Sequence, residues 1–436
     1  MTDRSQIIEA DWTWIDGAFK PNIQIVVTPP GRIEHVGTLD LKPGHRLRDR
    51  ALIPGFINAH SHAFQRGLRG LGERFPAEGA SFWTWREHMY RLVDRLDADA
   101  FYDLTHQAYR EMLAAGITTV GEFHYLHHDE SNDGFRFDEV VLTAAKDAGI
   151  RLVLLQTYYR TGGINAPMSN AQQRFATPST AAFRCQLERL TSVLDSESQS
   201  IGLAAHSIRA VPPDDLVELH RMSREFGMVF HMHVEEQRQE IADCYAAYGR
   251  TPMALLNERL HVDERFTAVH GTHTSSEDMN QFAKRGGNIC LCPLTEANLG
   301  DGMADAPGML QSGANICLGT DSNVRISMVE EMRWLEYAQR LRHESRGCCR
   351  NDRGEVAPLL LGAASENGAR SLGVPAGRIK PGMQADFALL NLSTGSLSGW
   401  KPETILDALI FGSDSDAIEA VCVGGRWIPA LEPAPH

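Results

Sequence analysis

The chain has 436 residues, of which 43% are hydrophobic, 22% charged and 8% aromatic. This composition is typical of a globular protein with room for one large domain and a smaller one. A formal net charge of −14 argues against nucleic acid or an anionic membrane surface as a partner, although a local arginine cluster can still bind an anionic small molecule.

The first residues, MTDRSQIIEADW, contain no basic segment followed by an apolar one, so we expect no signal peptide. No apolar run in the sequence approaches the length of a membrane span. The eight cysteines include no Cys-x-x-Cys pair, which favours thiols that stay reduced in the cytoplasm.

Short strand candidates begin the chain at residues 12–15, 23–27 and 33–36, with glycine and proline turns between them. From residue 51 onward, apolar strand candidates alternate with segments of helical spacing such as 97–115 and 213–226. The eight strand candidates of this part are 51–59, 117–123, 150–157, 201–206, 228–233, 267–270, 288–292 and 315–320. Short strands return after about residue 375, at 377–379, 385–390, 420–423 and 426–428.

Eight strands alternating with helices over roughly 270 residues match the size of a (β/α)₈ barrel. A doubly wound open sheet is the competing arrangement. The barrel is favoured because polar residues of the ligand type follow most strands at their carboxyl ends, which a barrel gathers around one mouth. We therefore predict an α/β fold: a TIM-like (β/α)₈ barrel over residues 53–374 and a small β-sandwich domain built from residues 1–52 and 375–436.

Histidines and acidic residues stand at the carboxyl ends of four of these strands. His60 and His62 follow the first strand, and both can reach one cation because strand residues i and i+2 point to the same side. The other candidates are His231, His233, Glu235 and Glu236 at strand five, His270 and His273 at strand six, and Asp321 at strand eight. Three imidazoles and a carboxylate, with one position left for water, form the ligand set of a catalytic zinc-type site. Such an ion lowers the pKa of a bound water from about 15.7 to near 7.

Motifs at these positions resemble a known family. PGFINAHSH at the first strand, the His-x-x-Glu of residues 233–236, His270 and GTDS at strand eight resemble the metal-dependent amidohydrolase superfamily, as does GRIKPGMQADFALL near the C-terminus. Within it, HSHAFQRGLRG, AHSIRAV and CPLTEANLGDG resemble the formimidoylglutamate deiminase branch. The resemblance covers essentially the whole chain. It implies hydrolysis of N-formimidoyl-L-glutamate to N-formyl-L-glutamate and ammonia in histidine degradation.

The resemblance also assigns roles by position. The implied metal ligands are His60, His62, His233 and Asp321. Glu236 would carry protons, Asp321 would accept a proton from the attacking water, and His270 would stabilise the attacked centre. Glu235 is the competing carboxylate, for which we expect a solvated helical position. Two-metal members of the superfamily use a carboxylated lysine, and no lysine occurs between Lys146 and Lys284, so we expect one divalent ion. Histidine and carboxylate ligands suit Zn²⁺ well but also accept iron or manganese.

The implied substrate is a small amidine with two carboxylates, and the resemblance points to five residues that contact it. They are Gln65, Arg86, Tyr125, His206 and Arg209. The planar guanidinium groups of the two arginines suit the carboxylates. The segment His127-His128-Asp129 fits no strand end, and we predict that it is a surface turn.

Two alternatives remain open at this point. A deaminase of a heterocycle such as guanine, cytosine or a thioadenosine would keep the mechanism, but it would need aromatic stacking and amide contacts rather than two arginines. A non-catalytic scaffold on the same fold would be expected to lose metal ligands. The resemblance alone also suggests a homodimer.

Overall fold

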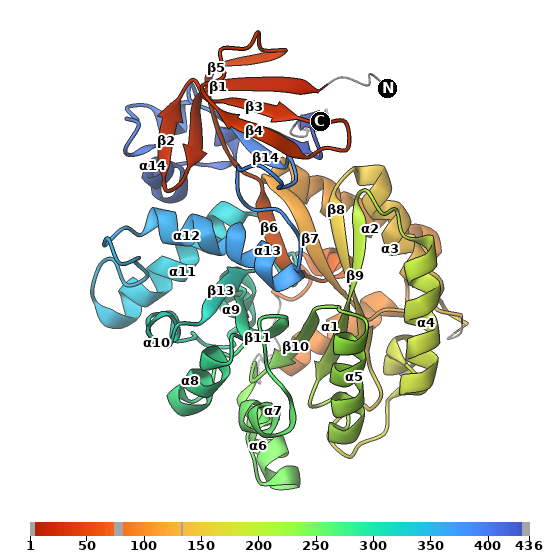
Figure 1. The fold of residues 1–436 in the computed structure, drawn as a ribbon. Coiled ribbons are helices and arrows are strands. Elements are labelled where there is room, and N and C mark those ends of the chain that lie inside the picture. Colours follow the sequence, from red (N-terminus) through yellow and green to blue (C-terminus); the bar gives the residue numbers. More distant parts are fainter. Residues whose placement is uncertain (1–4, 74–81, 132–133, 430–436) are drawn as a thin grey trace.

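The computed structural model describes residues 5–73, 82–131 and 134–429, and Figure 1 shows their arrangement. One sheet has eight strands in the order β13-β12-β11-β10-β9-β8-β7-β6, and all neighbours in it are parallel. A parallel bridge between Ser61 and Asp321 links the two edge strands, so that the sheet closes into a barrel. Its strands are β6 (Phe56–Ser61), β7 (Ile117–His124), β8 (Arg151–Tyr158), β9 (Gln199–Ser207), β10 (Phe230–Val234), β11 (Phe266–His270), β12 (Asn288–Leu291) and β13 (Asn315–Leu318).

The first predicted barrel strand is in fact two strands in two sheets. The apolar run is divided between β5 (His45–Pro54), which belongs to the second sheet, and β6 in the barrel. Gly55 lies between them, where an added Cβ would stand 2.3 Å from Thr118 Oγ1. Glycine is therefore required at the point where the chain crosses from one sheet to the other.

Helices surround the barrel sheet and follow the predicted alternation (Figure 1). The segment predicted at 97–115 forms α2 (Ala98–Ala114), which Asp97 caps by accepting the N–H of Ala100, and its residues Phe101, Ala108 and Met112 are buried. The other helices are α1 (Phe82–Val93), α3 (Arg136–Ala148), α4 (Thr180–Val193), α5 (Pro213–Glu225), α6 (Arg238–Tyr248), α7 (Pro252–Arg259), α8 (Ser276–Lys284), α9 (Pro293–Leu299), α10 (Ala306–Gln311), α11 (Met328–His343), α12 (Ala357–Ala363), α13 (Glu366–Leu372) and α14 (Ile405–Gly412). Short 3₁₀ turns lie at η1 (Ala63–Leu68), η2 (Asn170–Phe175), η3 (Gly395–Leu397) and η4 (Ser415–Ala417).

The second sheet joins the two ends of the chain, as predicted. Its order is β16-β15-β14-β5-β1-β3-β4, with β2 paired to β1, and the antiparallel pair β14–β5 connects the C-terminal strands to the N-terminal ones. The strands are β1 (Gln6–Ile15), β2 (Ala18–Pro21), β3 (Gln24–Val27), β4 (Ile33–Gly37), β14 (Phe387–Asn391), β15 (Ile418–Val423) and β16 (Arg426–Pro429). The predicted fold class is thus confirmed, while the exact domain boundaries stay a prediction.

One small strand was predicted wrongly. Residues 377–379 form no strand, because Gly377 has a φ of +79° and packs against the backbone of Ser365, where a Cβ would lie 2.7 Å from the carbonyl oxygen. Among the helices of residues 5–73, 82–131 and 134–429, none combines the length and the hydrophobicity of a transmembrane span.

Candidate functional site

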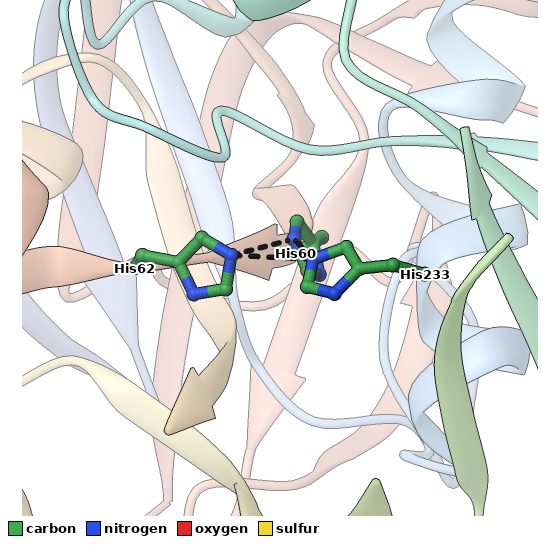
Figure 2. A group of neighbouring side chains, drawn as sticks. All are labelled: His60, His62 and His233. Atoms are coloured by element: carbon green, nitrogen blue, oxygen red, sulfur yellow. Dashed lines mark hydrogen bonds between the residues drawn. The ribbon is translucent and has the colours of Figure 1, made fainter. Parts of the chain in front are cut away.

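Three histidines from two distant parts of the sequence meet at the mouth of the barrel. The Nε2 atoms of His60 and His62 are 3.2 Å apart, and the Nε2 atom of His233 lies 3.1 Å from the first and 3.3 Å from the second. Figure 2 shows the three rings turned toward this common point. All three side chains are buried, with at most 5% of their surface exposed.

The hydrogen bonds behind these rings fix where the protons lie. His62 Nδ1–H donates to the carbonyl oxygen of Phe123 at 2.9 Å, and His233 Nδ1–H donates to the carbonyl oxygen of His206 at 2.9 Å. The Nε2 atoms of both rings are therefore unprotonated in the neutral imidazoles. Lone pairs that face one another at this distance repel unless a cation lies between them.

The spacing of the nitrogen atoms fits such a cation. In a tetrahedral site with zinc–nitrogen bonds of about 2.0–2.1 Å, neighbouring ligand nitrogens are about 3.3 Å apart. The carboxylate of Asp321 completes the group: its Oδ1 lies 3.4 Å from His60 Nε2 and 3.3 Å from His62 Nε2. We call His60, His62, His233 and Asp321 the mouth cluster.

The charge state of the mouth cluster also suits a cation. Burial, reinforced by the neighbouring His62, lowers the pKa of His60 to about 3, so this ring stays neutral. Burial also lowers the pKa of His62 and, most strongly, that of His233. Burial opposes the ionisation of Asp321, but the adjacent histidines outweigh it and hold the pKa of this carboxyl well below its usual range.

The backbone turns sharply at the three strand ends that supply this site. Glu235, His270 and Asp321 have φ values of +55°, +74° and +45°, in the left-handed region that costs a non-glycine residue about 1–3 kcal/mol. At the end of β10 this turn separates two neighbouring glutamates. Glu236 lines the cavity of the mouth, whereas Glu235 accepts the N–H of Met253 at 2.9 Å.

Glu235 is therefore not the solvated residue that was predicted, because only 1% of it is exposed. Glu236 contacts two charged groups: its Oε2 accepts Arg209 Nη2–H at 3.1 Å, and its Oε1 lies 3.9 Å from His270 Nε2. His270 Nδ1 is 3.3 Å from Glu296 Oε1. Burial opposes protonation of His270, but Glu236, Glu296 and Asp321 together raise its pKa to about 10.

A cavity of about 50 Å³ opens over His62, His233 and Asp321 of the mouth cluster. All five predicted substrate contacts line it: Gln65, Arg86, Tyr125, His206 and Arg209. Gln65 donates to the hydroxyl of Tyr125 at 2.8 Å, and Arg86 donates to the hydroxyl of Tyr159 at 3.3 Å. Polar groups that are held in place around one hollow in this way can orient a small ligand.

Two of the histidines considered at the strand ends lie elsewhere. His231 is on the same face of β10 as His233 but two residues earlier, about 7 Å deeper in the barrel. There its ring nitrogen Nε2 donates to the carbonyl oxygen of Ser371 at 2.9 Å. His273 lines a separate surface hollow, beside Arg238 and Met303.

Sequence reasoning assigned no role to Tyr159 or Glu296. Tyr159 follows β8 directly and lines the cavity, so its position at the carboxyl end of a barrel strand was a usable signal. Glu296 lies in the quoted motif CPLTEANLGDG and contacts His270, but the letters alone do not show that this loop turns back toward strand six.

The prediction of a surface turn at residues 127–129 is wrong. His127 is fully buried, and His128 and Asp129 are nearly so. His124 and His127 lie 2.9 Å from one carboxylate oxygen of Asp138, a residue of α3, while Gln156 and Gln186 donate to its other oxygen. We call these five residues the Asp138 network. The segment after β7 is held from a distant part of the chain: the backbone N–H groups of His127 and His128 donate to the carbonyl oxygen of Arg174 in η2 at 3.1 Å, and His128 Nε2 donates to that of Ala176 at 2.8 Å. The local pattern does not reveal these contacts.

A closed parallel barrel with three histidines and an aspartate at its carboxyl rim defines a metal-dependent hydrolase of the (β/α)₈ class. The chain matches the model of the amidohydrolase family over residues 51–428. It is 39% identical over 413 residues to formimidoylglutamate deiminase of Pseudomonas aeruginosa, an alignment that covers 93% of this chain and 91% of that protein. The chain therefore belongs to the amidohydrolase family, whose superfamily is metal-dependent.

Further relatives and solved structures are similar to the chain over most of its length. The 5-methylthioadenosine/S-adenosylhomocysteine deaminase of Pyrococcus abyssi is 26% identical over 394 residues, covering 89% of this chain and 85% of that protein. The crystal structure of an amidohydrolase from Brucella melitensis matches with a TM-score of 0.90 and 34% identity, over 96% of this chain and 94% of that one. An adenosine deaminase from Xanthomonas campestris, solved with bound zinc, shares the fold with a TM-score of 0.82 at 24% identity, over 97% and 92% of the two chains.

Proposed function

We propose that the protein hydrolyses N-formimidoyl-L-glutamate to N-formyl-L-glutamate and ammonia, as a step of histidine degradation. The observation that carries this proposal is that Arg86 and Arg209 line the same cavity as three residues of the mouth cluster and Glu236. Two guanidinium groups match the two carboxylates of such a substrate. The identity to the Pseudomonas aeruginosa deiminase over nearly the full length supports the same substrate.

We propose further that His60, His62, His233 and Asp321 hold one divalent ion, Zn²⁺. When bound, such an ion acts as a Lewis acid and lowers the pKa of a coordinated water from about 15.7 to near 7. The nitrogen spacing and the neutral imidazoles of the mouth cluster support this assignment. The absence of lysine between Lys146 and Lys284 supports a single ion.

The residues around the amidine carbon can then move the protons that hydrolysis requires. Water adds to this carbon, the bond to its terminal nitrogen breaks, and that nitrogen leaves as ammonia. Asp321, held ionised, is placed to accept the proton of the attacking water. Glu236 takes up the second proton of this water as the new carbonyl forms, and both protons pass to the terminal nitrogen, which leaves as ammonia. His270 donates a hydrogen bond to the developing charge at the attacked centre.

The proposed substrate contacts divide by charge. Arg86 and Arg209 bind the carboxylates, and the neutral groups of Gln65, Tyr125 and His206 orient the rest of the molecule. Burial holds the pKa of His206 well below its ordinary value, so it acts as a neutral donor or acceptor. All eight cysteines are free thiols, as in a reduced compartment, and we place the reaction in the cytoplasm.

Ammonia release tests this function directly. The zinc-loaded enzyme is given N-formimidoyl-L-glutamate and, in parallel, guanine, cytosine, adenosine and 5-methylthioadenosine. We expect the highest kcat/KM with the formimidoyl substrate. Turnover of the heterocycles alone would overturn the proposal in favour of a heterocycle deaminase, for which the aromatic rings of Tyr125, Tyr159 and Phe175 in the cavity would provide stacking surfaces. No turnover together with no bound metal would favour a scaffold.

A further inference from the structure

Arg209 stands between two glutamates that face it from the same stretch of chain. Its Nη2–H donates to Glu236 Oε2 at 3.1 Å, and its Nε lies 3.7 Å from Glu240 Oε2. Glu236 lines the cavity, whereas Glu240 lies on α6 outside the described residues that line it. One carboxylate thus faces the mouth and the other anchors the opposite edge of the guanidinium.

Glu240 is an unusual residue for the inside of a protein. Its side chain is completely buried, and neither carboxylate oxygen has a hydrogen-bond partner within residues 5–73, 82–131 and 134–429. A buried carboxylate without a partner destabilises the fold unless a nearby charge compensates for it. Arg209 is the cation that faces it, and burial together with Glu236 and Glu235 raises the pKa of Glu240 to about 7 despite that cation.

The proposed reaction places two demands on this group that conflict in the observed geometry. Arg209 has to bind a substrate carboxylate, and Glu236 has to exchange a proton with the substrate nitrogen. While Arg209 donates to Glu236, one guanidinium N–H and one carboxylate oxygen are occupied by each other. A substrate carboxylate that accepts this N–H takes the place of Glu236 Oε2, and that oxygen is then available for proton transfer.

We propose that Glu240 is a positioning residue that holds Arg209 while its guanidinium exchanges Glu236 for the substrate carboxylate. A shift of less than about 1 Å brings Arg209 Nε within hydrogen-bond distance of Glu240. The bond to Glu240 keeps the charge of Arg209 compensated and aims its two Nη groups at the cavity. The carboxylate of the substrate then releases Glu236 for proton transfer. This role rests on the proposed function.

The test compares variants on three substrates: N-formimidoyl-L-glutamate, N-formimidoyl-4-aminobutyrate, which lacks the α-carboxylate, and N-formimidoyl-L-norvaline, which lacks the side-chain carboxylate. The variant Arg209→Met identifies the carboxylate that Arg209 binds. The monoacid that lacks this carboxylate should be hydrolysed with nearly the same kcat/KM by the variant and by the wild type. We expect Glu240→Gln to follow the same pattern. For the two substrates that carry the carboxylate bound by Arg209, Glu240→Gln should lower kcat/KM about tenfold or more, mainly by raising KM. For the monoacid that lacks this carboxylate, the loss should be less than about threefold.

Equal losses of kcat/KM on all three substrates would show that Glu240 is merely structural and would overturn the proposal. An unchanged kcat/KM on all three would overturn it as well. Glu258→Gln, at an exposed ion pair with Arg250, is the matched control and should leave all three rates unchanged. If the wild-type enzyme releases ammonia from none of the three, the proposed function fails, independently of Glu240.

A measurement without turnover then judges the contact itself. We expect Arg209→Met to lower the thermal midpoint by leaving Glu240 uncompensated, and Glu240→Gln added to it to restore about half of the loss or more. Additive losses in the double variant would contradict the contact. Glu240→Asp, which keeps the charge, should retain the substrate pattern of the wild type if Glu240→Gln does not fold, and losing that pattern would overturn the proposal.

Discussion

Two groups of buried histidines lie on either side of strand β7, and they differ in what their ring nitrogens face. In the mouth cluster, nitrogen faces nitrogen at 3.1–3.3 Å. In the Asp138 network each ring nitrogen in contact has an oxygen partner: His124 and His127 donate to Asp138, and the second nitrogen of His127 donates to the carbonyl oxygen of Thr157 at 2.7 Å. His127 Nδ1 also lies 3.4 Å from a nitrogen atom, but this nitrogen is an amide donor, Gln156 Nε2. The carbonyl oxygen of Phe123 accepts the N–H of His62 in the mouth cluster, and the next residue, His124, belongs to the Asp138 network.

This difference separates a metal site from a hydrogen-bond network of similar composition. Both groups bring their candidate ligand atoms within 4.8 Å of one another, so proximity does not distinguish them. The carboxylate of Asp138 already accepts four donors and needs no cation. The nitrogen lone pairs of the mouth cluster face one another without a hydrogen-bond donor between them, and a cation at this point would remove their repulsion. We therefore expect a metal ion in the first group and none in the second.

Removal of one mouth histidine should have the largest effect. His60 is the best choice, because its Nδ1 has no hydrogen-bond partner among the described residues and the substitution breaks no second contact there. We expect His60→Ala to lose the bound metal and at least about 10³-fold in kcat, since Lewis-acid stabilisation amounts to several kcal/mol. Mass spectrometry of the metal and the rate of ammonia release check this. A variant that keeps its metal and a tenth of its activity would contradict the assignment.

The proton-transfer role of Glu236 should come next in size. Glu236→Gln removes the titrating group but keeps its shape, and we expect kcat to fall about 10²–10⁴-fold while the metal content stays unchanged. Glu235→Gln is the matched control, because Glu235 is the next residue in the chain but its carboxylate accepts the N–H of Met253 and does not face the cavity. Steady-state kinetics of both variants decide the matter. Should the control lose more activity than Glu236→Gln, the two roles would have to be exchanged.

The Asp138 network should respond in stability rather than in rate. Asp138→Asn removes the charge and replaces one of the two acceptor oxygens with an NH2 donor, so that two of the four donors lose their acceptor. We expect a loss of about 3–5 kcal/mol in the free energy of unfolding. Metal content and kcat per folded molecule should stay near the wild-type values. Urea unfolding monitored by circular dichroism measures the first, and a loss of metal would show that this group is a metal site after all.

The same variant has a defined pH dependence. Burial opposes the ionisation of Asp138, but His127 and His124 outweigh it and hold its pKa well below the ordinary value of 3.8. A carboxyl whose pKa is depressed by folding stabilises the protein above its unfolded pKa, and this contribution is lost as the pH falls. The difference in stability between wild type and Asp138→Asn should therefore be constant from about pH 8 to pH 5 and shrink below about pH 4. A difference that grows toward acid pH would be inconsistent with an ionised Asp138.

Substitution of Glu122 should give the smallest effect, and it should raise the free energy of unfolding instead of lowering it. It lies on β7, and its Oε1 accepts the N–H of Ala63, next to the mouth cluster, at 2.7 Å. Burial raises the pKa of Glu122 from 4.5 to about 8, so its contribution to stability is complete below pH 4.5 and is lost as the pH rises to about 8. Glu122→Gln cannot ionise, and it should gain roughly 1 kcal/mol or more on the wild type over this range. Thermal midpoints of both proteins at pH 5 and pH 9 test this expectation. The same difference in midpoint at both pH values would refute the raised pKa of Glu122.

The sequence allowed the barrel, the joined chain ends and the strand-end residues to be predicted, because apolar periodicity and residue position carry that information. It did not distinguish the two histidine groups. His127 was assigned to a surface turn, since nothing local shows that it contacts Asp138 of α3, or that Gln156 and Gln186 of two further elements donate to the same carboxylate. The opposite directions of Glu235 and Glu236 depend on one left-handed residue, a backbone feature that side-chain identity does not reveal.

The location of the bound metal tests the central claim most directly. Crystals of the zinc-loaded protein, measured on both sides of the zinc absorption edge, should show one anomalous peak per chain, between His60, His62, His233 and Asp321. No peak should appear among His124, His127 and Asp138. A peak in the second group, or an empty mouth cluster in a protein that hydrolyses its substrate at full rate, would contradict the account.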